Sequence, residues 1–168
     1  PEEPYEGATV LDAQKGAYYT PITALDFEAL YPSIIMAHNL CYSTWVMDEK
    51  KYGNVPGVTY EIFEVGGKKY KFAQDVPSLL PSILLELKQF RKQAKKDMAA
   101  STDAMKEMFN GKQLAYKISM NSVYGFTGAG KGMLPCVPIA STVTSKGRSM
   151  IEETKKYVEK NFPGAKVR

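Results

Sequence analysis

The sequence is poor in the residues from which disulfide scaffolds and Cys/His metal sites are built. Its 168 residues include only two cysteines, one histidine and one tryptophan. Two cysteines, Cys41 and Cys136, are too few for a disulfide scaffold, so we expect two free thiols, as is usual in a reducing compartment. No apolar run approaches the roughly 18 residues of a membrane span, and no basic-then-apolar leader opens the chain. We therefore expect neither a membrane partner nor secretion.

The bulk composition is ordinary for a globular protein. Hydrophobic residues make up 44% of the chain and charged residues 24%, which is close to the average of globular domains. The length suits one domain, or part of a larger one, with a real core. The chain opens on Pro1 and stops after "PGAKVR" without a cap or tail, so we interpret it as an excerpt from a longer protein.

Charge is unevenly distributed along the chain. Residues 1–50 contain eight acidic and two basic residues, whereas the remainder contains 10 acidic and 20 basic residues. The acidic N-terminal segment suggests that cations bind there, and the basic remainder of the chain suggests a polyanionic partner.

The first half of the chain is predicted to hold a strand, a short helix and a hairpin. "TPITALDF" (20–27) is short, apolar and β-branched, which favours a buried strand ending near Asp26. A turn at Pro32 and a short helix should follow. Apolar and polar residues alternate on both sides of Gly66-Gly67, a pattern that predicts a β-hairpin with a primed two-residue turn.

The second half is predicted to be mainly helical. Residues 77–98 form a long amphipathic pattern whose apolar side holds Ile83, Leu84, Leu87, Phe90 and Ala94. Ser101-Thr102-Asp103 should break it and cap a second helix, over about 104–124. A glycine-rich loop over 125–132 and a last helix over 141–161, stopped by Pro163-Gly164, complete the prediction. The class is α+β, with a helical hairpin set into a base that bears a sheet.

Polar residues follow both predicted hairpin helices at helical spacing. The first helix has Lys88, Arg91 and Lys95, and the second has the stripe Lys106, Asn110, Gln113, Lys117, Asn121 and Tyr124. With the turn near residue 104, Arg91 and Lys117 would stand level, about 20 Å from the tip. Two cations at the same level of the hairpin could bind a phosphate between them. The alternative is a solvated, lysine-rich hairpin, and spacing does not decide between them.

One stretch imitates a phosphate-binding loop. "GFTGAGKG" (125–132) matches G-x-x-x-x-G-K, but Gly132 stands where a magnesium-binding Ser or Thr is needed. A long predicted helix, rather than a strand, precedes it. A nucleotide triphosphatase that depends on Lys131 is therefore a minor alternative.

Two motifs read together carry a specific resemblance. "DFEALYPSI" (26–34) resembles motif A of the family B DNA polymerases, and "KISMNSVYG" (117–125) matches their motif B, K-x-x-x-N-S-x-Y-G, at every fixed position. Stretches such as "GKQLAYK" and "VTSKGRSMIEETK" resemble the delta-like branch, most closely the enzymes of large algal viruses (phycodnaviruses). The resemblance implies a catalytic-subunit fragment with three parts: a palm segment (1–76), a helical-hairpin fingers segment (77–124) and a return to the antiparallel palm (125–168).

The resemblance also implies the chemistry of motif A. Template-directed synthesis would join a deoxynucleotide to a primer 3′-hydroxyl with two Mg²⁺ ions. Asp26 would bind metal, helped by the Phe27 carbonyl, and Tyr31 would be the steric gate against ribonucleotides. The backbone N–H groups of Ala29, Leu30 and Tyr31 would face the triphosphate. Ala29 departs from the family, many of whose members carry Ser there, so only its backbone donor remains.

On the fingers, the resemblance assigns the triphosphate to four positions: Arg91, Lys95, Lys117 and Asn121. Lys117 is also a candidate general acid toward pyrophosphate. Tyr124 and Gly125 would lie beside the nascent base pair and template.

The family's second metal aspartate lies in a Y-G-D-T-D-S motif, which this sequence does not contain. The chain by itself is therefore expected to be inactive. Primer-template DNA and dNTPs are the expected partners, with a sliding clamp bound through regions outside this chain. The expected location is the nucleus for a cellular enzyme, or the host nucleus or a cytoplasmic replication site for a viral one. A non-catalytic basic nucleic-acid-binding module is the main alternative.

Overall fold

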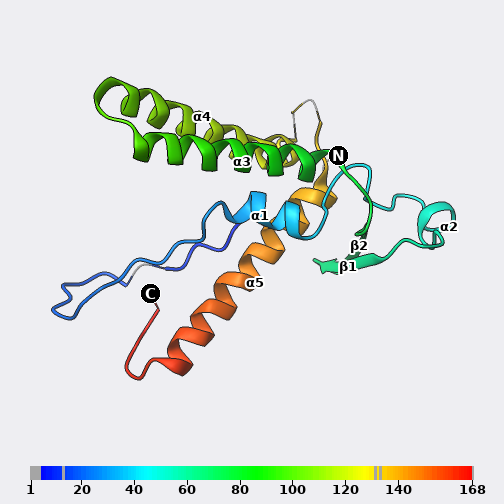
Figure 1. Cartoon of the computed structure of the whole chain (residues 1–168). Helices are drawn as coiled ribbons and strands as arrows, with labels where there is room; N and C mark the ends of the chain where they lie inside the picture. Colours follow the sequence, from blue (N-terminus) through cyan, green and yellow to red (C-terminus); the bar gives the residue numbers. More distant parts are fainter. Residues whose placement is uncertain (1–4, 13, 131, 133, 168) are drawn as a thin grey trace.

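A helical hairpin packs across a short central helix. The computed structural model describes residues 5–12, 14–130, 132 and 134–167. The elements are α1 (Leu30–Ala37), α2 (Glu49–Tyr52), β1 (Tyr60–Val65), β2 (Lys68–Ala73), α3 (Leu79–Ala100), α4 (Asp103–Gly128) and α5 (Val137–Asn161). Helix α1 contacts α3, α4 and α5, while β1 and β2 extend to one side (Figure 1). The expected α+β class, with a long helical hairpin, is confirmed.

The β-hairpin forms as its alternating sequence predicts. Strands β1 and β2 pair antiparallel, with Tyr60 opposite Ala73 and Val65 opposite Lys68. Gly66 and Gly67 join them with φ of 58° and 77°. Both values lie in the left-handed region that a primed turn needs and that glycine adopts without steric cost.

The second helix of the hairpin is longer than predicted. Helix α4 ends at Gly128 rather than near Tyr124, so the predicted glycine-rich loop over 125–132 is wrong in its first half. Burial explains the extension. Thr127 is 1% exposed, its hydroxyl donates to the Tyr124 carbonyl at 2.8 Å, and its own carbonyl accepts the Cys136 N–H at 2.8 Å. This packing outweighs the low helix propensity of the glycines.

Helix α5 starts four residues before its predicted start, at Val137. Pro138 lies in its first turn, where a missing N–H leaves no intrahelical bond unmade, so this proline opens the helix rather than blocking it. The predicted end at Asn161 is confirmed, and Gly164 follows with φ of 82°.

The buried strand predicted over 20–27 is wrong. Residues 21–27 have no regular structure, and Ile22 and Leu25 are 75% and 73% exposed. This part of the chain runs in the extended blue excursion that leaves the helices (Figure 1). A strand needs partners for its N–H and C=O groups. Within the described ranges, the pairings join β1 to β2 and Trp45 to Phe72 of β2, and none of them includes residues 21–27. The turn expected at Pro32 is also displaced, to residues 28–29, with Pro32 inside α1.

The core lies where α1, α3, α4 and α5 meet. It contains Ile34, Ile35, Leu40, Phe72, Leu84, Met120, Ile139 and Val143, among others. On α3 the buried apolar side chains are Leu80, Leu84 and Ala94, whereas Ile83 and Phe90 of the predicted face are 37% and 46% exposed. No helix within the described ranges combines the length and the apolar character needed to cross a membrane.

Asn39 ties the end of α1 to the start of α3. It follows α1 with a φ of 49°, and its amide donates to the Ala73, Gln74 and Val76 carbonyls at 2.9 Å each. Its side-chain oxygen accepts from the Ser78 hydroxyl just before α3. These bonds hold the β2–α3 connection on α1, so the hairpin and the N-terminus of α1 keep a defined relation.

Candidate functional site

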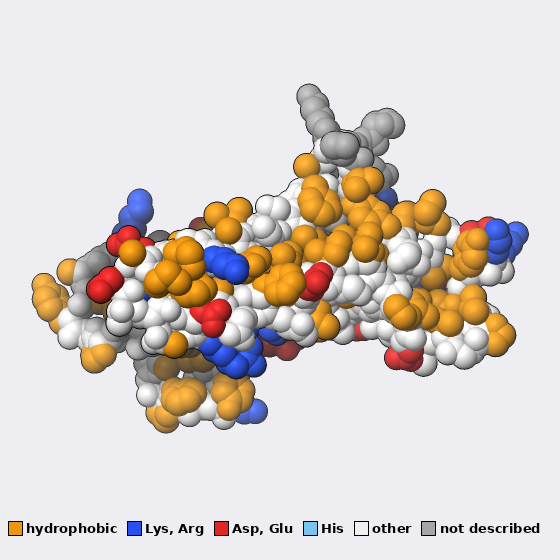
Figure 2. Space-filling model, turned by 45° about the horizontal axis from the view of Figure 1, so that its top comes forward, with side chains coloured by type: hydrophobic (Ala, Val, Ile, Leu, Met, Phe, Trp, Pro, Cys, Tyr) orange, Lys and Arg blue, Asp and Glu red, His pale blue; other side chains and the backbone are white. Residues whose placement is uncertain are grey.

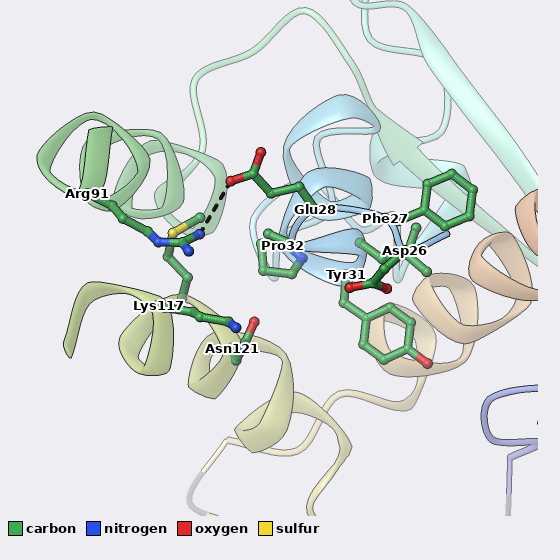
Figure 3. Close-up of a pocket in the computed structure, with 11 residues that line it drawn as sticks. Asp26, Phe27, Glu28, Tyr31, Pro32, Arg91, Lys117 and Asn121 are labelled. Atoms are coloured by element: carbon green, nitrogen blue, oxygen red, sulfur yellow. Dashed lines mark ion pairs between the residues drawn. The ribbon is translucent and has the colours of Figure 1, made fainter. Parts of the chain in front are cut away.

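A cavity of about 530 Å³ separates the N-terminus of α1 from the hairpin helices. Its volume falls within the roughly 300–1,000 Å³ of typical small-molecule sites. Figure 3 shows the residues around it, which come from the loop before α1, from α1, from α3 and from α4. The lining residues are Asp26, Phe27, Glu28, Ala29, Leu30, Tyr31, Pro32, Arg91, Lys117, Met120 and Asn121.

Backbone geometry at the start of α1 prepares it to receive an anion. Ala29, the N-cap, has φ 49° and ψ 54°, a left-handed conformation that is uncommon for a residue other than glycine and costs of order 1 kcal/mol. The N–H groups of Leu30 and Tyr31 belong to the first turn and have no intrahelical acceptor. Together with the positive end of the helix dipole they favour negative charge on the cavity side.

Acidic and basic side chains face each other across this cavity. Asp26 and Glu28 come from the loop before α1, and Arg91 and Lys117 come from the hairpin (Figure 3). Asp26 is exposed. Glu28 Oε1 lies 3.6 Å from Arg91 Nη1 and 3.4 Å from Lys95 Nζ. The arrangement can hold a cation on one side and phosphate groups on the other.

The hairpin register differs from the prediction by about one turn. Arg91 Nε donates to Gln113 Oε1 at 3.3 Å, so Gln113, and not Lys117, stands level with Arg91. The reason is the position of the turn, which lies at Ser101-Thr102 rather than near residue 104. Lys117 still reaches the cavity with Arg91, one turn farther from the tip.

Tyr31 is held between two helices. Its ring centroid lies 4.5 Å from that of Tyr124 on α4. Behind it, a Cβ added at Gly147 of α5 would lie 3.1 Å from Tyr31 Cε1, so glycine provides the room that the ring uses. The Tyr124 hydroxyl lies 3.5 Å from that of Tyr5. Burial raises the pKa of Tyr31, although nearby Arg148 opposes the rise. Burial also raises the pKa of Tyr124 beyond its usual range. Both phenols are therefore protonated at neutral pH.

Most of the residues singled out in the sequence meet at this cavity. Eight of them line it: Asp26, Phe27, Ala29, Leu30, Tyr31, Arg91, Lys117 and Asn121. Three do not. Lys95 lines a smaller adjoining hollow of about 100 Å³, Tyr124 reaches the cavity through Tyr31, and Gly125 is exposed on α4.

Sequence reasoning missed Glu28 and Gln113. Glu28 lies within motif A, but its partners are more than 60 residues away, and no spacing rule connects a loop carboxylate to them. Gln113 was placed on the polar stripe of the second helix, yet it is only 8% exposed. Its amide bonds to Asn110 at 3.0 Å, which orients its oxygen toward Arg91. The helical period indicated on which face of its helix Gln113 lies. Its partner, Arg91, could be identified only from the register of the two hairpin helices.

The donor set is consistent with magnesium held partly by a substrate. Within the described part of the chain, no three His, Cys, Asp or Glu side chains gather as a metal site. Asp26 and the Phe27 carbonyl are hard oxygen ligands, and Mg²⁺ is usually bound through one or two carboxylates together with substrate phosphates. Asp26 and Phe27 therefore fit a shared magnesium site but do not complete one.

The hairpin surface is not simply covered with solvated lysines. Helix α4 exposes Met105, Met108, Leu114 and Ile118, by 43% to 66%. Figure 2 shows hydrophobic side chains interspersed with charged ones along this face of the molecule. As for the phosphate-loop alternative, Lys131 lies outside the described residues. The helix α4, rather than a strand, precedes it, which is the wrong context for that motif.

Comparison with known proteins gives a consistent result. A model of DNA polymerase family B matches residues 1–167. The chain is 51% identical, over 173 aligned positions, to a DNA polymerase of Paramecium bursaria Chlorella virus NY2A, covering 97% of this chain and 19% of that protein. It is 46% identical to the DNA polymerase delta catalytic subunit of Candida albicans, covering 95% and 16%. The expected likeness to delta-like and algal-virus polymerases is confirmed.

Among solved structures, the family B DNA polymerase from the hyperthermophilic archaeon Pyrobaculum calidifontis resembles the chain with a TM-score of 0.72 at 23% identity. This match covers 95% of the chain and 20% of that structure, and it concerns the fold. The chain thus spans about a fifth or less of the proteins that it matches.

Proposed function

Because this chain belongs to DNA polymerase family B, whose model matches residues 1–167, we propose that it forms the nucleotide site of a template-directed DNA polymerase. The observation that carries the proposal is the convergence of Asp26, Arg91, Lys117 and Asn121 on one cavity. Motif A and motif B are separated by about 90 residues in the sequence, and the hairpin brings them together across a space large enough for a nucleotide.

In this proposal the two sides of the cavity have complementary roles. Arg91, Lys117 and Asn121 bind and orient the triphosphate, and the N–H groups of Leu30 and Tyr31 bind it from the opposite side. Asp26 and the Phe27 carbonyl would hold Mg²⁺, with the phosphates as its other oxygen ligands. The magnesium would neutralise charge on the reacting phosphate and lower the pKa of the primer hydroxyl. Lys117 has the role of neutralising, and of protonating, the departing pyrophosphate in this proposal.

Tyr31 is proposed as the sugar gate, and its packing supports that role. A ring held between Tyr124 and the space at Gly147 cannot retreat easily from a 2′-hydroxyl. In the complete polymerase, Tyr31→Ala is expected to increase ribonucleotide use relative to deoxynucleotide use by about tenfold, the lower end of what steric pockets give. The measurement is the ratio of kcat/KM for matched rNTP and dNTP incorporation.

A matched control is available on α5. Tyr157 is 64% exposed and does not line the cavity, so Tyr157→Ala should leave the ratio unchanged. An unaltered ratio in the Tyr31→Ala enzyme would remove the gate from the proposal without affecting the roles of Asp26 and Lys117.

The 168-residue chain alone is proposed to be inactive, because its sequence contains Asp26 but not the Y-G-D-T-D-S motif in which the resemblance places the second metal aspartate. We expect no magnesium-dependent primer extension from the isolated chain, measured on a labelled primer-template. Extension at a rate comparable to that of the complete polymerase would contradict this.

The remaining assignments are proposals of the same kind. The division into palm (1–76), fingers (77–124) and returning palm (125–168) stays a prediction, and α4 continues past residue 124. Lys95, Tyr124 and Gly125 keep their predicted roles at the triphosphate and the nascent base pair. Primer-template DNA and dNTPs are the proposed partners, with a sliding clamp bound elsewhere in a longer chain. The viral and delta-type relatives support replication in the nucleus or at a viral replication site.

A further inference from the structure

Glu28 forms ion pairs with Arg91 and Lys95, two of the basic residues proposed to bind the nucleotide triphosphate. One carboxylate oxygen, Oε1, lies 3.6 Å from Arg91 Nη1 and 3.4 Å from Lys95 Nζ. Arg91 and Lys95 are one turn apart on α3, so a single acid is shared between two cations on one helix face. Figure 3 shows the Glu28 side chain extending from the loop before α1 to Arg91 across the edge of the cavity.

The contacts are of a kind that can be exchanged. Charge-assisted hydrogen bonds between such groups usually measure about 2.7–2.9 Å, and both distances here are longer. The Glu28 side chain is 77% exposed, whereas that of Arg91 is only 14% exposed. Gln113 also holds Arg91 through a different nitrogen, because Arg91 Nε donates to Gln113 Oε1 at 3.3 Å. The cation is therefore fixed in place, and the carboxylate is the partner that is free to leave.

On this basis, and resting on the proposed function, we propose that Glu28 is an internal competitor of the incoming triphosphate that lowers the affinity of the site for nucleotides. A triphosphate carries several negative charges and displaces one carboxylate from Arg91 and Lys95. The displaced Glu28 remains close to the phosphates, because it belongs to the same cavity wall. The Glu28 carboxylate and the phosphates are both negative and repel each other at short distance. The site therefore binds nucleotide less tightly than it would if only its basic residues acted on the phosphates.

A structural tie is the competing explanation, and it predicts the opposite result. If Glu28 served to position Arg91 and Lys95 for phosphate, its removal would weaken nucleotide binding. If the ion pairs were too solvated to matter, as many exposed pairs are, its removal would change nothing. Competition alone predicts tighter binding.

The test is Glu28→Gln in the complete polymerase, which keeps the size of the side chain and removes its charge. Single-nucleotide incorporation should show a KM for dNTP lowered by about 3- to 10-fold, as expected for losing ion pairs of this exposure. The change should appear in KM rather than in kcat. Because salt screens the ion pairs, the difference between the two enzymes should shrink as ionic strength rises.

Glu86→Gln is the matched control, since Glu86 is exposed on the same helix and does not line the cavity. It should leave KM unchanged. A KM that rises or stays constant in the Glu28→Gln enzyme would overturn the inference. Lys117→Ala separates this failure from failure of the proposed function. If Lys117→Ala impairs nucleotide use and Glu28→Gln does not improve it, only the competitor role is lost. If neither changes it, the nucleotide site itself is refuted.

Discussion

Replacing Asp26 with asparagine is expected to reduce primer extension by the complete polymerase by about 10³-fold or more. The amide keeps the shape of the side chain but lacks the charge with which a carboxylate holds magnesium, and losing one preorganised charge at a reacting phosphate costs at least this order of rate. Asp26 is exposed, on the cavity wall, so the substitution should leave the melting temperature unchanged. Steady-state primer extension and thermal unfolding of the same preparation test both statements.

The same variant distinguishes the polymerase from its main alternative. A non-catalytic nucleic-acid-binding module would tolerate Asp26→Asn without functional loss. Asp97→Asn is the control, because Asp97 lies on α3, does not line the cavity, and its side chain accepts a hydrogen bond from its helical neighbour Gln93 at 2.8 Å. Equal extension by the Asp26→Asn, Asp97→Asn and unaltered enzymes would refute the catalytic role of Asp26.

Lys117→Ala is expected to lower kcat/KM for dNTP by about 10- to 150-fold. Lys117 lines the cavity with Arg91 and Asn121, and a charge-assisted contact to phosphate is worth about 1.5–3 kcal/mol, which gives this range. If Lys117 also stabilises or protonates the leaving pyrophosphate, kcat should fall together with kcat/KM. If it only binds the ground state, the loss should be confined to KM.

Lys112→Ala provides the comparison on the same helix. Lys112 is exposed on α4 and does not line the cavity, so its removal takes away one positive charge without touching the proposed triphosphate contacts. Pre-steady-state single-turnover kinetics on both variants should separate the specific loss at Lys117 from a general weakening of DNA binding. An equal loss in the two variants would mean that Lys117 acts only through its charge on the surface.

Local sequence signals were reliable where the physics is local. The primed turn at Gly66-Gly67 was predictable because left-handed φ values select glycine. The two long hairpin helices were predictable because their periodic patterns exceed 20 residues. Helix ends were less predictable. The extension of α4 to Gly128 depends on the burial of Thr127 and its bond to Cys136. The early start of α5 depends on Pro138, which fits the first turn of a helix.

The segment before motif A shows where local sequence signals fail to predict the structure. Its composition favours a strand, yet residues 21–27 have no strand partner within the described ranges. A strand is stabilised by hydrogen bonds to a neighbour and not by its own residues, so β-propensity alone cannot establish it. The chain covers 19% of the matched algal-virus DNA polymerase, so that protein is about five times as long as this chain.

The amino-acid sequence was sufficient to assign the family, the residue types of the site and the helical face of most of them, because motifs and periodicity are properties of the chain. Which of these residues meet depends on the tertiary structure. The turn at Ser101-Thr102 sets Gln113, not Lys117, beside Arg91. The packing of α1 against the hairpin brings Glu28 to Arg91 and Lys95. Both outcomes depend on register and distance between segments far apart in the chain, which side-chain spacing within one helix does not encode.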